Sequence, residues 1–457
     1  MSETLDLATL GTGAVVAPAG HGKTYSIART VASHPDLRIL VLTHTNAAVA
    51  ALKRHIGSQG GGRVRIDTIA AFCLKLVRSF PGRAEWHESE QLDLSSLQPA
   101  ALRALSCATI LEVVAMGFDL LIVDEYQDCS ADQARAVDLL SDVMPTIVLG
   151  DPLQAIFDFG SAPADPWSGS SNALPHLGTL SVPHRWKRTN PSLGEWILHA
   201  RQELLAGRRP SSTGPHPVEL ESLDRDAAQG GLSRLIPRNG TTAIISPDPS
   251  NPNALSSIAR SYKGRVRVAE KSDLAEVRVI ARTLDQTSDR AAVLVALIGF
   301  ASKIRTKVAS SVVQTLSKNL KAKGAASTSK HPVVLAARKY LTDGSTDALL
   351  EYFRHLTSAP DGHTYRPQLH QLWIRILSMS LADSGPSFEE HAIALIERSN
   401  HRTSWEPFGT VVGTTLRLKG LEFDNVIILD PHTIRARNHL YVALSRPTKR
   451  LIIARTQ

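Results

Sequence analysis

Cysteine is scarce in this chain. The three cysteines, Cys73, Cys107 and Cys129, lie far apart and none belongs to a Cys-x-x-Cys pair. Neither a disulfide framework nor a zinc site is indicated by that spacing. The N-terminus has no basic segment followed by a long apolar run, so it does not read as a secretory signal peptide. We therefore expect a protein of the reducing cytoplasm.

Long hydrophobic runs are also missing. The longest, Ala291 to Ala301, is far short of the ~20 residues that a membrane-spanning helix needs. The chain has 457 residues, 43% of them hydrophobic and 21% charged, which is ordinary for a globular protein with real cores. Domains of roughly 100–200 residues predict two to four domains. A formal net charge of +8 suits an anionic partner but does not identify one.

The first part of the chain alternates short apolar runs with amphipathic helical patterns. Strands are predicted at LRILVLTHT, FDLLIVDEY and PTIVLGDP, and the runs within them, such as LLIVD and TIVLGD, are continuous rather than alternating. Continuous runs are typical of strands that are buried on both faces of a parallel sheet. The pattern predicts an α/β doubly wound domain over residues 1–180.

A Pro/Ser/Gly-rich stretch, SAPADPWSGSSNALPHLG, then marks a boundary. Strand and helix patterns resume over 181–290, and they return over 405–457 with NVIILD and the final RLIIAR. Residues 291–404 show helical periodicity with few strand runs. We predict a second α/β domain over 181–290 and 405–457, interrupted by a helical insertion at 291–404.

The sharpest motif runs from Ala17 to Thr24, APAGHGKT, between an apolar strand and a helix. Its glycines allow the backbone to curl so that N–H groups face phosphates, helped by the N-terminus of the helix. In such a loop Lys23 contacts the β- and γ-phosphates, and the Thr24 hydroxyl is a ligand of Mg²⁺. A chance match in a loop is the alternative. The residues expected to bind the nucleotide are Ala19, Gly20, His21, Gly22, Lys23 and Thr24.

Two adjacent carboxylates end the strand in FDLLIVDEYQD. ATP hydrolysis needs one acidic group to hold Mg²⁺ through its water shell and one to orient or deprotonate the attacking water. Asp124 suits the first role, as a metal-binding residue, and Glu125 suits the second. A solvated acidic strand end is the alternative, but it does not explain a position downstream of a phosphate loop.

The run DEYQD resembles the D-E-x-Q-D motif of the superfamily 1A helicases, the UvrD/Rep-like family. Four further segments are similar to motifs of that family, in its order: Leu149–Phe157, Val182–Arg185, Lys419–Phe423 and Leu440–Arg446. The resemblance implies two RecA-like P-loop domains with parallel sheets, a reduced helical insertion in the second, and ATP with Mg²⁺ between the domains. It implies a compact ATP-dependent DNA helicase or translocase.

The same resemblance assigns roles to single residues. Gln154 and Arg185 become γ-phosphate contacts, Glu422 a ribose contact and Arg446 an arginine finger. Each has a plain alternative: Gln154 as a loop cap, Glu422 as the start of a strand, Arg446 as a surface arginine. In order and in context, the motifs favour the functional interpretation.

Further segments resemble the family's nucleic-acid contacts. Aromatic stacking on bases tolerates any sequence, which suits a motor on single-stranded DNA. Core packing is the alternative for the two aromatics that follow Gln154, and helix capping is the alternative for the threonines. The predicted contacts are Thr43, His44, Thr45, Asn46, Thr68, Phe72, Phe157 and Phe159.

Several departures weaken the nucleic-acid residues more than the ATP site. No glutamine precedes Ala17 to read adenine, so preference for ATP is less secure. His44 replaces an aromatic residue, Ala70 replaces a histidine, and Leu416 replaces another histidine of the family pattern.

Two hypotheses of different class follow. The leading one is an ATP-hydrolysing translocase or helicase on single-stranded DNA, moving 3′→5′ as the resemblance implies. The other is an ATP-gated sensing or regulatory subunit that works with a partner nuclease, in DNA repair or antiviral defence, without processive unwinding. RNA is a less favoured partner, and no membrane partner is expected.

Overall fold

The computed structural model describes most of the chain, with gaps. The described residues are 5–57, 63–86, 94–157, 174–211, 217–223, 228–246, 252–269, 275–308, 330–358, 362–383, 385–402 and 409–456. Contacts divide the chain into two compact units. Unit 1 comprises Met1–Val218, Thr403–Trp405 and Ile434–Leu451, and unit 2 comprises Glu219–Arg402, Glu406–Thr433 and Ile452–Gln457. Each unit is described by itself.

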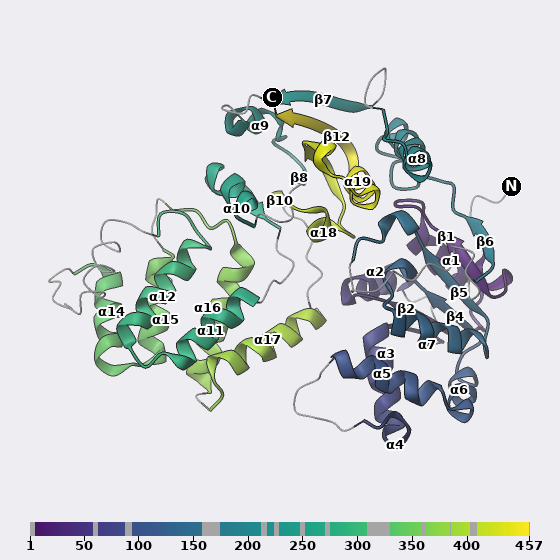
Figure 1. The fold of residues 1–457 in the computed structure, drawn as a ribbon, viewed down its shortest axis with the longest axis horizontal. Coiled ribbons are helices and arrows are strands. Elements are labelled where there is room, and N and C mark those ends of the chain that lie inside the picture. The colour runs from purple at the N-terminus through teal and green to yellow at the C-terminus, as the bar shows by residue number, and fades with distance from the viewer. Residues whose placement is uncertain are drawn as a thin grey trace. The chain divides into compact units, whose positions relative to one another are not determined.

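Unit 1 is built on a six-stranded sheet with the order β3-β2-β4-β5-β1-β6 (Figure 1). All five neighbouring pairs are parallel, as the continuous apolar runs predict. The strands are β1 (Gly13–Val16), β2 (Ile39–Thr43), β3 (Val64–Thr68), β4 (Leu120–Val123), β5 (Thr146–Gly150) and β6 (His176–Thr179). The connecting elements are α1 (Lys23–Ser33), α2 (Asn46–Ile56), α3 (Ile69–Ser79), α4 (Pro81–Ala84), α5 (Leu94–Leu105), α6 (Ala108–Ala115), α7 (Ala131–Ser141) and α8 (Pro191–Leu205), with short 3₁₀ turns η1 (Leu7–Thr9), η3 (Tyr126–Asp128) and η4 (Pro152–Gln154).

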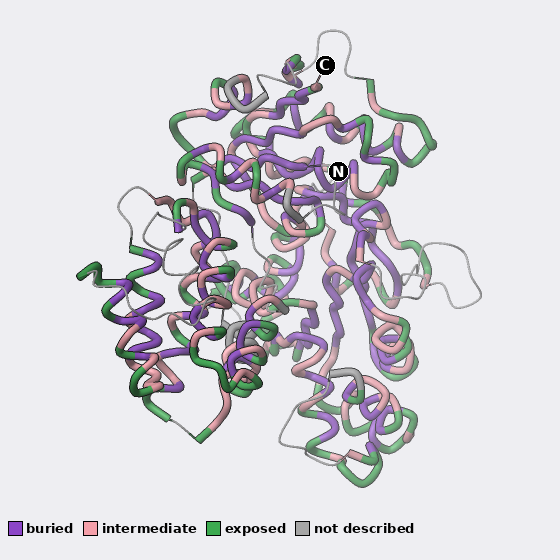
Figure 2. Tube along the Cα trace, turned by 60° about the vertical axis from the view of Figure 1, so that its left-hand side comes forward, coloured by how far each residue is buried: buried purple, intermediate pink, exposed green. Residues whose placement is uncertain are grey.

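Successive strand residues of this sheet belong to two different cores. Ile39 and Val41 of β2 pack with α1 and α2, whereas Leu40 and Leu42 pack with α3, α5 and α7. This alternation is the period of two that every β-strand imposes on its side chains. Because helices cover both faces, the four inner strands β1, β2, β4 and β5 are buried along their whole length (Figure 2), whereas the edge strands β3 and β6 are partly exposed.

A second six-stranded sheet has the order β7-β12-β11-β8-β10-β9. The pairs β11–β8, β8–β10 and β10–β9 are parallel. The expected α/β class with two parallel sheets is confirmed. The strands are β7 (Val218–Leu223), β8 (Thr242–Ile245), β9 (Val266–Val268), β10 (Thr410–Gly413), β11 (Phe423–Leu429) and β12 (Pro447–Thr456); the helices along them are α9 (Ala228–Leu235), α10 (Pro252–Ser261), α18 (Thr415–Leu418) and α19 (Arg437–Leu444), with the turn η5 (Pro431–Thr433).

A group of helices between β9 and β10 has a hydrophobic core of its own, in which the rings of Phe300, Phe353 and Trp373 contact one another. The helices are α11 (Ala275–Gln286), α12 (Arg290–Ser302), α14 (Pro332–Asp343), α15 (Thr346–Leu356), α16 (Pro367–Ala382) and α17 (Phe388–Arg402). The helical character expected for this segment is observed, but α11 already contributes to the core. These helices belong to unit 2 together with most of the second sheet. The boundaries expected for a separate helical insertion therefore stay predictions.

Among the described residues, no single helix is long and apolar enough to cross a membrane; one pair, Ser96–Leu105 with Ala108–Ala115, meets the length and composition test only when joined across a 90° bend.

Candidate nucleotide site

The loop between β1 and α1 has the backbone of a phosphate loop. Gly20 and Gly22 have φ angles of 73° and 83°, in the left-handed region that favours glycine. Helix α1 begins at Lys23, directly after Gly22. Its first N–H groups lack partners within the helix and carry the positive end of the helix dipole. The loop therefore presents donors and positive potential where an anionic phosphate binds.

The segment after β6 lies directly against these glycines. A Cβ atom at Gly20 would lie 2.8 Å from the ring of Trp186, and one at Gly22 would lie 2.6 Å from the ring of His184. The backbone N–H of Arg185 donates to the carbonyl of Gly20 at 3.0 Å. Both positions thus require glycine, because the backbone has a positive φ and a side chain would clash with Trp186 or His184. The segment after β6 also holds the loop in place through the Arg185 hydrogen bond.

The ammonium of Lys23 sits between the two predicted Walker carboxylates. Its Nζ lies 3.0 Å from Oδ1 of Asp124 and also forms an ion pair with Glu125. Burial by itself would lower the pKa of Lys23, but the two carboxylates outweigh it and hold that pKa above its usual value. Lys23 is therefore a permanent cation at the start of α1.

Glu125 is held in an uncommon backbone conformation. Its φ is 58°, which costs energy in a residue other than glycine and is found where surrounding contacts enforce it. Its backbone N–H donates to Asp124 Oδ1 at 3.0 Å, and the amide of Gln127 donates to its carboxylate. The carbonyl of the Gln127 side chain accepts from the backbone of Asp151 at 3.0 Å. Gln127 thus connects the Glu125 carboxylate with the Gln154 motif.

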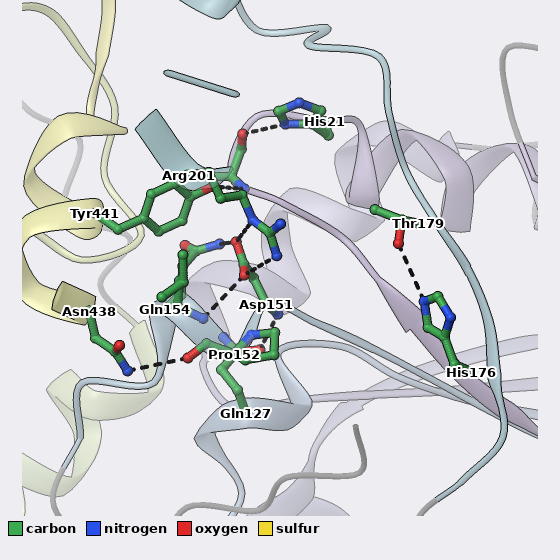
Figure 3. Close-up of polar contacts among 12 residues, drawn as sticks. His21, Gln127, Asp151, Pro152, Gln154, His176, Thr179, Arg201, Asn438 and Tyr441 are labelled. Carbon is green, nitrogen blue, oxygen red and sulfur yellow. Dashed lines mark hydrogen bonds and ion pairs between the residues drawn. The ribbon is translucent and has the colours of Figure 1, made fainter. Parts of the chain in front are cut away.

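A buried network joins that motif to the phosphate loop (Figure 3). Asp151 is fully buried and accepts from the Arg201 guanidinium at 2.9 Å. Tyr441 is fully buried as well, and its hydroxyl accepts from the backbone N–H of Ala19 at 3.2 Å. The same hydroxyl interacts with both Arg201 and Asp151. Because Tyr441 belongs to α19, the C-terminal helix supports the phosphate loop from within unit 1.

The predicted arginines and Gln154 are also in unit 1. The Arg446 guanidinium, 2% exposed, donates to the Gln154 side chain at 3.4 Å and to Ser445 Oγ at 2.9 Å. Arg185 donates to the Ser445 carbonyl at 2.5 Å. The sequence places both arginines in the second domain; here α19 packs against η4 and α8, so both are part of the compact unit that contains the P-loop.

His21 is the buried side chain of the loop itself. It is 2% exposed, and its Nδ1 lies 2.8 Å from the Ala19 carbonyl, which makes Nδ1 the donor. Burial lowers the pKa of His21, so the ring is neutral at pH 7. Its Nε2 is buried with no hydrogen-bond partner in the described part of the chain. A neutral acceptor here adds no charge to the phosphate loop.

An aromatic pair lies beside the start of α1. The ring of Tyr25, half exposed, lies 5.7 Å from that of His184, tilted by 34°. Flat side chains next to a phosphate loop offer a surface on which a base can stack.

The residues predicted to contact nucleic acid have mixed surroundings. Thr45 is exposed and caps α2 by accepting from Ala48 at 3.1 Å, and Nε2 of His44 lies 3.5 Å from Cys129 Sγ. Thr68 caps α3 by accepting from Ala71 at 3.1 Å. The capping alternative therefore holds for both threonines. Asn46 and Phe157 are half-buried, and Phe159 lies outside the described residues.

Two of these expectations are corrected by burial. Phe72 is 6% exposed because its ring packs in the core between the sheet and α5, so no base can stack on it. The Thr43 side chain is 0% exposed, inside the sheet, and cannot contact a strand on the surface.

The residues present fit ATP with Mg²⁺. Mg²⁺ keeps several waters and takes one or two carboxylates together with phosphate oxygens, so it needs no dedicated cage. Among the described residues, no group of three or more His, Cys, Asp or Glu lies together in a way that could hold a metal ion. Asp124 and Thr24 are the residues that would hold it. Glu422 belongs to unit 2, where it is exposed just before β11, and its ribose contact stays a prediction.

One family of known proteins matches the part of the chain that contains the phosphate loop. Residues 6–160 match a family described as an AAA domain. The match covers the P-loop, the Asp124 and Glu125 carboxylates and Gln154, but less than half of the chain. No curated protein matches.

Two solved structures of the Arterivirus nonstructural protein 10 helicase, one of them with DNA, are similar at 11% and 10% identity, each over 99% of this chain, with a TM-score of 0.33. The chain spans 62% and 60% of those two chains.

Sequence reasoning missed several residues of the site. Arg201 and Asn438 carry no motif signal; Asn438 donates to the carbonyl of Ala155 at 2.8 Å, beside Gln154. Tyr441 and Gln127 lie inside recognised motifs, but the motifs do not predict the buried contacts that these two side chains make.

Proposed function

We propose that this protein is an ATP-hydrolysing motor that moves along single-stranded DNA, a compact translocase or helicase of the superfamily 1A type working 3′→5′. One observation carries the proposal: the Lys23 ammonium at the end of a phosphate loop is bracketed by Asp124 and Glu125. A lysine, a metal-binding carboxylate and a base in this arrangement are what phosphoryl transfer to water requires.

The side chains divide the chemistry among themselves. The loop amides and Lys23 would bind the phosphates. Thr24 and Asp124 would hold Mg²⁺, whose charge would offset that of the phosphates. Glu125, fixed by its backbone and by Gln127, orients the attacking water and accepts its proton. Tyr25 and His184 provide a stacking surface for the base.

Arg185 and Arg446 supply positive charge that stabilises the transferring phosphoryl group. Both are fixed through Ser445: Arg185 on its carbonyl and Arg446 on its hydroxyl. Gln154 contacts Arg446. A change at the nucleotide therefore reaches α19 through at most two side chains, which supports coupling between hydrolysis and motion.

The contact with DNA rests on α2 and the loop before it. Thr45 is exposed at the N-terminus of α2, where a helix binds phosphate. Three basic residues, Lys53, Arg54 and His55, are exposed in the last turn of the same helix. His44 links this loop to Cys129, which directly follows the DEYQD run. Backbone contacts of this kind bind DNA without reading its sequence.

The first test is steady-state ATPase activity with and without single-stranded DNA, with Lys23→Ala as the control. Strong stimulation by DNA that disappears in Lys23→Ala supports the motor. Normal hydrolysis by Lys23→Ala would show that the site is wrongly assigned. Competition between DNA and RNA oligonucleotides then decides the nucleic acid.

The burial of Thr43 and Phe72 favours a second candidate, an ATP-gated DNA-sensing subunit that acts with a partner nuclease. With the side chains of those two residues buried, fewer of the predicted contacts are left to bind DNA. DNA-stimulated hydrolysis without strand displacement, and without removal of streptavidin from biotinylated single strands, would support this candidate over the translocase.

A further inference from the structure

The hydroxyl of Thr43 is a buried polar group that has no role in the proposed hydrolysis mechanism. Thr43 is the last residue of β2, its side chain is 0% exposed, and Oγ1 has no hydrogen-bond partner anywhere in the described ranges. Buried hydroxyls nearly always have a protein or water partner, because an unpaired one is destabilising. This hydroxyl therefore requires an explanation.

The pattern of the two cores shows which face of the sheet Thr43 occupies. Ile39 and Val41 pack on the side of α1 and α2. Thr43 follows in the same alternation and so lies on the α1 face. That is the face on which the side chain of Lys23, the first residue of α1, meets its carboxylates.

The strand register puts Thr43 next to Asp124. Leu42 pairs with Val123, and the ladder continues because the N–H of Asp124 donates to the Leu42 carbonyl at 2.8 Å. Leu120 and Ile122 of β4 also pack on the α1 face, so Asp124 shares it with Thr43. Neighbouring strands lie about 4.8 Å apart, so the two side chains are adjacent on this face of the sheet.

The neighbour on the other side is already engaged. Thr43 pairs in register with Thr68, whose hydroxyl caps α3 by accepting from Ala71. The open direction is therefore toward Asp124 and the start of α1.

We infer that Thr43 is a positioning residue of the nucleotide site: its hydroxyl would hold the neighbouring Asp124 side chain in place when Mg²⁺ is bound. This inference rests on the proposed function and moves Thr43 from the DNA contacts to the hydrolysis site. Removal of a group that orients a metal's shell typically weakens metal affinity 10–100-fold.

The experiment compares Thr43→Val, which keeps the shape and removes the hydroxyl, with Thr43→Ser, which keeps the hydroxyl. The matched control is Thr146→Val, in β5 of the same sheet. Thr146 is equally buried, but its hydroxyl is paired, donating to the Met144 carbonyl at 3.1 Å, at the opposite end of the strands.

Three quantities are measured: the Mg²⁺ dependence of binding of a fluorescent non-hydrolysable ATP analogue, the unfolding temperature of the nucleotide-free protein, and the affinity for single-stranded DNA. For Thr43→Val we expect the Mg²⁺ concentration that gives half-maximal binding of the analogue to rise about 10-fold or more. Its unfolding temperature should not fall, and its affinity for DNA should be unchanged. Thr43→Ser should need the same Mg²⁺ concentration as the wild type. Thr146→Val shows the reverse, a lower unfolding temperature with normal Mg²⁺ dependence.

Wild-type Mg²⁺ dependence in Thr43→Val would overturn the inference. So would lost DNA affinity with unchanged Mg²⁺ dependence, which would return Thr43 to the nucleic-acid contacts. If wild-type protein binds no ATP analogue, or binds it as well as Lys23→Ala does, the proposed function itself fails, and the inference fails with it for that separate reason.

Discussion

The hydroxyl of Tyr441 accepts a hydrogen bond from the backbone N–H of Ala19 at 3.2 Å, although the two residues are 422 positions apart. One is in α19, which ends just before the predicted arginine finger Arg446, and the other is in the phosphate loop. The contact is buried and shares its hydroxyl with Asp151 and Arg201. The far end of the chain therefore shapes the loop that binds phosphate.

Tyr441→Phe tests this contact. The change leaves the Ala19 N–H and the Asp151 carboxylate without one partner each, at a cost of about 1–3 kcal/mol in the free energy of unfolding. We also expect weaker nucleotide binding, since the loop loses a support. Urea denaturation and titration with a fluorescent ATP analogue measure the two effects. Wild-type affinity combined with lost stability would restrict Tyr441 to a structural role.

The Asp151–Arg201 ion pair is nearly inaccessible to solvent, with side chains 0% and 10% exposed. Asp151→Asn leaves a buried guanidinium charge uncompensated, and breaking a buried pair in this way costs about 3–5 kcal/mol. The double variant Asp151→Asn/Arg201→Met should lose less stability than the sum of the single variants, because it removes both charges. The exposed pair Glu203–Arg208 offers a control, in which Glu203→Gln leaves the denaturation midpoint unchanged. If the stability losses of the two single variants simply add up in the double variant, Asp151 and Arg201 do not interact.

Glu125→Gln should bind nucleotide and fail to turn it over. The amide keeps the size of the side chain but cannot accept a proton, and loss of a general base lowers kcat about 10²–10⁴-fold. Single-turnover kinetics and analogue binding separate the two properties. Asp119→Asn, before the opposite end of β4, is the matched control and should have normal turnover, since Asp119 is paired with Arg38 on the surface. A kcat for Glu125→Gln close to wild type would reject Glu125 as the base.

The burial of His21 predicts a pH dependence of stability. Because its pKa is lowered in the folded protein, the unfolded chain binds the proton more readily. Stability is therefore complete above the unfolded pKa of about 6.5 and falls as the pH drops below it. The neighbouring charges give the same sign, since Arg201 and Arg185 oppose protonation more than Asp151 assists it.

His21→Gln should flatten this slope, measured as the urea midpoint from about pH 8 to about pH 5. His370, in unit 2, also has a pKa lowered by burial, so His370→Gln serves as a comparison that reports the contribution of His370 to the slope. An identical slope in wild type and His21→Gln would show that the His21 ring titrates normally.

The sequence by itself determined the frame of the site. Continuous apolar runs specify strands covered on both faces, and the carboxyl ends of parallel strands meet at one edge of a sheet. Asp124 and Glu125 follow one such strand and Lys23 follows a loop after another, so their meeting could be predicted from local patterns. The glycines of the loop and the order of the motifs needed no three-dimensional information.

The tertiary structure alone decided which way side chains point and which distant segments touch. Thr43 and Phe72 lie in recognised motifs, yet the strand alternation and the helix packing direct them inward. Arg201 has no motif, and its role exists only because α8 brings it to Asp151. Periodicity is a local property of the chain, whereas a contact such as Ala19 with Tyr441 depends on how separately folded segments pack, and no short stretch of sequence records that.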